Sequence, residues 1–128
     1  MIQVRKAPQG ALQYDLAVGK NHVVADEPVD IGGDDAGPSP HDLLDMALGA
    51  CTAITVTLVA RRKQMPLEDV RVEITHDEAN GLYKLNRKVT FVGNLTDEQR
   101  TYLLGIANKC PIHKALNGKF EIATEMKS

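Results

Sequence analysis

The chain has 128 residues, 43% of them hydrophobic and 25% charged, which fits one globular domain with a packed core. Its 15 basic and 17 acidic side chains give a formal net charge of −2, and its aromatic residues are three Tyr and two Phe, without Trp. A chain with this charge and so few rings lacks the positive field and stacking surfaces of nucleic-acid binders, and it does not attract anionic lipid. We therefore expect a single domain over residues 1–128, with neither nucleic acid nor a membrane as partner.

The first six residues carry charges without a preceding apolar stretch, so no secretion signal is predicted and we expect a cytoplasmic protein. In that reducing compartment, two cysteines far apart in the sequence are expected to be free or redox-active. Residues 11–18 partly alternate apolar and polar side chains, and a break at 19–21 before 22–25 predicts a hairpin. Residues 26–40 are rich in Pro, Gly and Asp, which indicates an irregular loop that could border a site.

Signals for a helix start follow this loop. Ser39 is suited to the N-cap, Pro40 to the first helical position, and Asp42 to the third position after the cap. Residues 43–60 carry one charge and apolar groups on every face, which predicts a helix packed all round that ends at the basic residues 61–63. The run approaches the length of a membrane span, but its Asp, Gly and Thr residues lower its apolarity and favour a buried central helix.

The second half of the chain predicts a hairpin, a helix and a last strand. Residues 70–75 and 82–92 alternate around an Asn-Gly turn at 80–81, and Thr96 to Gln99 is a capping pattern for a helix that reaches Cys110. Residues 120–124 predict a final short strand. This order indicates an α+β fold in which an antiparallel sheet wraps around two central helices.

Both cysteines have a reactive and a structural interpretation. Cys51 lies within the apolar helix among small residues that would let a pocket reach its sulfur, yet free cysteine often serves only as a small buried hydrophobe. Cys110 is a candidate N-cap of a turn opened by Pro111, where unpaired N–H groups and nearby cations would lower the cysteine pKa. Its structural alternative is a capping residue beside a basic patch formed by Lys109, His113 and Lys114.

The two sulfurs together suggest peroxide chemistry. One thiolate would attack an O–O bond and become a sulfenic acid, the other would resolve it as a disulfide, and a dithiol would reopen that disulfide. A carboxylate and a cation beside the attacking sulfur would assist, because charge develops on the leaving oxygen.

Three motifs carry a family resemblance. Residues 37–44 read Gly-Pro-Ser-Pro-His-Asp-Leu-Leu, residues 47–52 read Ala-Leu-Gly-Ala-Cys-Thr, and residues 110–113 read Cys-Pro-Ile-His. From about Leu12 to its end, the chain resembles the OsmC/Ohr family of osmotically inducible and organic-hydroperoxide-resistance proteins. The loop at 27–33 resembles the branch also found fused behind α/β-hydrolase domains.

The resemblance implies that Cys51 is the peroxidatic sulfur and Cys110 the resolving one. It also implies an intertwined homodimer, sites at the subunit interface, an external lipoyl-type dithiol reductant and no bound cofactor. Family peroxidases place a Glu directly after the helix-opening proline and pair it with an N-terminal Arg, whereas here His41 follows the proline and Asp42 comes next. Asp42, His41 and His113 are thus candidate supporting residues, capping is the alternative role of Asp42, and no arginine is assigned by motif.

Other chemistries have weaker support. Cys110 and His113 could form a zinc site only if the fold gathered His22, His41 or His76 beside them, so no metal is expected. The leading hypothesis is a thiol peroxidase that reduces organic hydroperoxides through Cys51 and Cys110. The alternative is a binding or stress-response module of the same fold with little or no peroxidase turnover.

Overall fold

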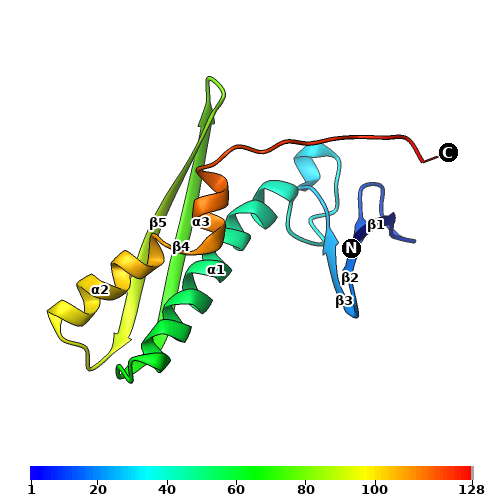
Figure 1. The fold of residues 1–128 in the computed structure, drawn as a ribbon. Helices are drawn as coiled ribbons and strands as arrows, with labels where there is room; N and C mark the ends of the chain where they lie inside the picture. The colour runs from blue at the N-terminus through cyan, green and yellow to red at the C-terminus, as the bar shows by residue number, and fades with distance from the viewer. Residues whose placement is uncertain (128) are drawn as a thin grey trace. The chain divides into compact units, whose positions relative to one another are not determined.

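The computed structural model describes residues 1–127, and Figure 1 shows its elements. In chain order they are β1 (Ile2–Lys6), β2 (Tyr14–Val18), β3 (Asn21–Ala25), the 3-10 turn η1 (Val29–Ile31), α1 (Pro40–Arg62), β4 (Leu67–Ala79), β5 (Leu82–Gly93), α2 (Asp97–Ala107) and α3 (Pro111–Leu116). The strands form two antiparallel sheets, β1-β2-β3 and β4-β5, which confirms the α+β class.

The chain divides into two compact units, Met1–Met46 and the remainder from Ala47 onward. The expectation of a single domain over 1–128 stays a prediction. In the first unit the predicted hairpin is confirmed as β2 and β3, and β1 adds an unpredicted third strand along β2.

A buried carboxylate organises the loop that follows β3. Asp26 is 2% exposed and accepts hydrogen bonds from the backbone N–H groups of Glu27 at 2.8 Å, Asp34 at 3.1 Å and Ala36 at 3.0 Å. The Ala36 hydrogen bond is the largest influence on the Asp26 pKa; with the other two and the charge of Lys6, it outweighs burial and lowers that pKa. Except for η1, the loop is irregular, as the sequence predicts.

Helix α1 begins as predicted, because Asp42 and Ser39 cap each other. The Asp42 N–H donates to Ser39 Oγ at 3.1 Å, and the Ser39 N–H donates to Asp42 Oδ2 at 3.0 Å. By length and composition α1 could span a membrane, but the core helix of a globular protein passes the same test.

The prediction that α1 is packed all round is wrong for the single chain. Its buried residues form one stripe at four-residue spacing, Leu48, Thr52, Val56 and Ala60. Ile54 and Leu58, in contrast, are 60% and 46% exposed. The described residues supply packing partners for one side of α1 only, so its remaining apolar surface stays open.

The second unit packs α1 and α2 with the long β4-β5 ribbon. The ribbon turns at Asn80 and Gly81, whose φ angles of 55° and 76° are those of the tight hairpin turn predicted from this pair. The hydrophobic core of the second unit consists of Val56, Ala60, Phe91, Leu95, Leu103 and Ala107.

Two boundaries near the C-terminus differ from the prediction. The capping box of Thr96 and Gln99 opens α2 as expected, but α2 ends at Ala107 and a short turn precedes Cys110. The predicted strand at 120–124 is absent from the described residues, because no strand there offers it a partner. Phe120 and Ile122 are instead 65% and 87% exposed.

Candidate functional site

Helix α1 and the start of α3 bring the two cysteines together. Cys51 is half-buried on α1, at the edge of its buried stripe, whereas Cys110 is fully buried, and both thiols are free. Thr52, the next residue on α1, is 0% exposed, and its Oγ1 is 4.0 Å from the Cys110 Sγ. The structure thus joins the two residues that the sequence singled out.

The N-terminus of α3 donates backbone hydrogen bonds to both sulfurs. Cys110 is its N-cap, as predicted, and its Sγ accepts the backbone N–H of His113 at 3.3 Å. The next free N–H in this turn, that of Ile112, donates to the sulfur of Cys51. Pro111, between them, has no N–H to satisfy. Each sulfur therefore receives one donor from the positive end of the same helix.

These contacts favour the thiolate of Cys51. Partial burial is the largest single influence and raises the pKa of Cys51, but hydrogen bonds from the Ile112 N–H, the Cys110 thiol and the Thr55 hydroxyl together outweigh it. The net pKa of Cys51 is lowered below the ordinary thiol value. The Cys110 thiol is one of these donors, so the two sulfurs are in direct hydrogen-bond contact.

Arg87, on β5, is a cation that the motif analysis did not find. Its Nη1 donates to Thr52 Oγ1 at 2.9 Å, and its Nη2 donates to Asn108 Oδ1 at 2.8 Å. The same Nη2 lies 3.2 Å from His113 Nδ1. A guanidinium can only donate, so His113 accepts at Nδ1, and when neutral it carries its proton on Nε2.

A pattern in the sequence could have identified this arginine. Positions 83, 85, 87, 89 and 91 point to one face of β5, and four of these five residues are Tyr, Leu, Val and Phe. A single charged residue in such an inward row needs a polar partner on the opposing element.

The other predicted supporting residues have different positions. His113 lies in the cysteine cluster, and its supporting role stays a prediction. Asp42 and His41 belong to the N-terminal unit, where Asp42 caps α1 and His41 is exposed in its first turn. A supporting role for these two residues stays a prediction. Within residues 1–127, no three His, Cys, Asp or Glu side chains gather as metal ligands.

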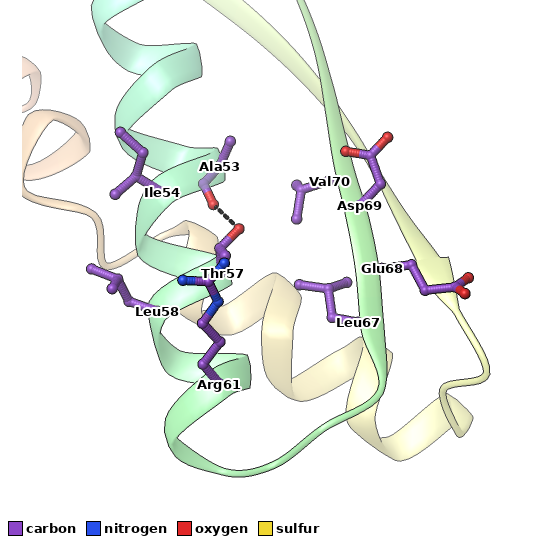
Figure 2. A pocket seen from close by; sticks show the side chains of 9 residues that line it. All are labelled: Ala53, Ile54, Thr57, Leu58, Arg61, Leu67, Glu68, Asp69 and Val70. Atoms are coloured by element: carbon purple, nitrogen blue, oxygen red, sulfur yellow. Dashed lines mark hydrogen bonds between the residues drawn. The ribbon is translucent and has the colours of Figure 1, made fainter.

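Two cavities lie near the cluster, and a cysteine lines neither. One, of about 330 Å³, has a cationic and imidazole wall made by Arg87 and His113, with leucines opposite. The other, of about 420 Å³, is a groove between α1 and β4, shown in Figure 2, where Ile54 and Leu58 border it on the helix.

Comparisons with known proteins identify the family and the fold of the chain. The profile of the family described as OsmC-like protein matches residues 32–125. A search of the curated proteins finds no match. A Psychrobacter arcticus protein, described provisionally as an osmotic stress induced and detoxification response protein, shares 25% identity and a TM-score of 0.77 over 89% of this chain and 85% of its own.

Two further solved structures share the fold. The organic hydroperoxide resistance protein OsmC of Legionella pneumophila is 21% identical, with a TM-score of 0.65 over 92% of this chain and 88% of that one. The organic hydroperoxide resistance protein OhrB of Bacillus subtilis is 21% identical, with a TM-score of 0.58 over 92% and 90%. With a family profile that covers most of its length and a shared fold, this chain belongs to the OsmC-like family.

Proposed function

We propose that the protein is a thiol peroxidase that reduces organic hydroperoxides, with Cys51 as the attacking sulfur and Cys110 as the resolving sulfur. The observation that carries this proposal is the shared N-terminus of α3, which donates one N–H to each sulfur. The lowered pKa of Cys51 adds to it, because the thiolate is the nucleophile. The names of the hydroperoxide resistance proteins with the same fold point to the same substrate class.

The proposed cycle has three balanced steps. The Cys51 thiolate attacks the terminal oxygen of the hydroperoxide, so that an S–O bond forms, the O–O bond breaks, and the released alkoxide takes a proton to become an alcohol. The Cys110 sulfur then attacks the Cys51 sulfenic acid, which forms a disulfide and releases water. An external dithiol, for which a lipoyl-type compound is proposed, reduces this disulfide and is itself oxidised to a cyclic disulfide.

The surroundings of Cys51 favour an apolar substrate. Ile54 and Leu58 lie three and seven residues after Cys51 on α1, which puts them on its side of the helix. Both are largely exposed and could contact the alkyl or aryl group of a hydroperoxide.

The same exposed surface supports a homodimer in which a second copy covers α1. An apolar helix surface this open is unusual for a monomer in water. Light scattering across a range of protein concentrations tests the assembly, and the mass of a single chain at every concentration would contradict it.

Thiol counting after addition of cumene hydroperoxide tests the function. Wild type should lose both thiols per hydroperoxide consumed, whereas Cys51→Ser should lose none. Cys110→Ser should consume one equivalent and leave a sulfenic acid that dimedone traps. Consumption of hydroperoxide by Cys51→Ser at the wild-type rate would overturn the proposal.

A binding module with little turnover is the second candidate. Among the described residues, the contacts given for Cys51 are a peptide N–H, a thiol and a hydroxyl, and none is a cation that would stabilise the leaving alkoxide directly. This alternative predicts one stoichiometric reaction without sustained hydroperoxide loss when dithiol is added, while apolar ligands still raise the melting temperature.

A further inference from the structure

We propose that Arg87 is a positioning residue that holds Cys110 and the start of α3 against Cys51 for the resolving step. The inference rests on the proposed peroxidase function. It concerns the second step of the cycle, the attack of Cys110 on the oxidised sulfur.

The contacts of Arg87 reach every segment that presents a cysteine. Thr52 adjoins Cys51 on α1, Asn108 lies in the turn before Cys110, and His113 lies on α3, where its backbone N–H donates to the Cys110 sulfur. One guanidinium therefore joins the attacking helix to both sides of the resolving residue. A planar fork of donors suits this task, because it can bind several acceptors in fixed directions.

The contact with Thr52 also fixes the orientation of a hydroxyl beside Cys110. Thr52 Oγ1 donates its one hydrogen to the Leu48 carbonyl oxygen at 2.7 Å. It accepts from Arg87, so toward the Cys110 sulfur it can act only as a further acceptor.

Arg87 is well anchored, whereas α3 by itself is not. Arg87 lies within the β4-β5 ladder, opposite Ile74, with paired residues on both sides. Helix α3 has six residues, a length that is not stable in isolation and depends on tertiary contacts. The three partners of Arg87 named above are a hydroxyl, an amide and an imidazole, and none of them carries a negative charge.

Loss of Arg87 should therefore slow the resolving step more than the first step. Without Arg87, α3 is expected to move away and to take Cys110 with it. Cys51 remains on α1 and can still react with hydroperoxide. The Cys51 sulfenic acid then lives longer.

The test compares Arg87→Met with wild type in two measurements on the full chain. The first is the rate of hydroperoxide consumption in one turnover, and the second is the rate of disulfide formation, with dimedone trapping the sulfenic acid. We expect resolution to slow by about tenfold or more, the effect of one lost charge-assisted hydrogen bond, with a clearly smaller change in the first step. Arg71→Met is the matched control, since Arg71 lies on the neighbouring strand β4, is exposed and contacts Asp69.

Two further variants distinguish positioning from general damage. Asn108→Ala removes one acceptor of Arg87 from an exposed turn. It should also slow the resolving step, by a smaller factor than Arg87→Met. Arg87→Lys keeps the charge, but its three donors sit on one nitrogen and lack the planar fork that reaches acceptors on separate segments, so its rate of resolution should fall below that of wild type. Equal slowing of both steps in Arg87→Met, or wild-type resolution in Arg87→Lys, would overturn the inference. Absence of thiol loss in wild type would instead overturn the proposed function.

Discussion

Replacement of Thr52 by Val tests the link between α1 and β5 directly. The two side chains have similar shapes, and position 52 is fully buried, so packing is largely retained. Two hydrogen bonds are lost, one donated to the Leu48 carbonyl oxygen and one accepted from Arg87, together with the 4.0 Å contact to the Cys110 sulfur. The first costs little, because a helical carbonyl already accepts a backbone N–H.

The hydrogen bond from Arg87 determines how much stability Thr52→Val should lose. A hydrogen bond to a charged group contributes about 1.5 to 3 kcal/mol, and because Arg87 is only half-buried, water recovers part of this. We expect the free energy of unfolding to fall by about 1 to 2 kcal/mol. For a chain of 128 residues this corresponds to a drop of roughly 4 to 7 °C in melting temperature.

Thr57→Val is the matched control. Thr57 donates the same kind of bond, to the Ala53 carbonyl oxygen at 2.7 Å, as Figure 2 shows, but it lies on the groove side of α1 away from Arg87. Its replacement should change stability by less than about 0.5 kcal/mol. Urea unfolding under reducing conditions, at one fixed protein concentration, measures both variants. If Thr52→Val costs no more than Thr57→Val, Arg87 does not stabilise the cluster through this hydroxyl.

Three other predictions follow from contacts in the two units. The rate of Cys51 alkylation by iodoacetamide is obtained by subtracting the rate of Cys51→Ser from that of wild type. It should reach half its maximum at a pH below the ordinary cysteine pKa, because the pKa of Cys51 is lowered. A midpoint at or above about pH 8.5 contradicts this prediction. Asp26 has a lowered pKa when folded, so its stabilising contribution is present above the unfolded-state value of about 3.9 and is lost as pH falls through the folded value. Urea midpoints between pH 3 and 7 should show a weaker acid-side slope in Asp26→Asn. Gly33→Ala should unfold at lower urea concentration, since a Cβ there would overlap the Glu27 carbonyl oxygen, whereas Gly105→Ala, which meets nothing within 4 Å, should not.

Local signals in the sequence predicted the parts of the fold that depend on neighbouring residues. The caps at Ser39 and Thr96, the Asn80-Gly81 turn and the proline after Cys110 each act over a few positions, and each was confirmed. The family motifs added the pairing of Cys51 with Cys110, which spacing alone could not supply.

Features that depend on distant partners were predicted poorly. The strand at 120–124 and the full burial of α1 both require partner surfaces, which residues 1–127 of one chain do not supply. The role of Arg87 could not be predicted, because its contacts join a strand to two helices far away in the sequence and no local motif marks it. Its place in an apolar row of β5 indicates an inward charge, but not which residue it meets.

The donors at the start of α3 also bear on how readily the cycle can be reversed. Their N–H groups stabilise an anionic sulfur, and that anion exists only while the pair is reduced. Oxidation to the disulfide removes the charge and forfeits this stabilisation, so the reduced state gains relative to the oxidised one. We therefore expect the Cys51–Cys110 disulfide to have a higher reduction potential than a structural disulfide, and a mild dithiol would be enough to return the protein to its active form.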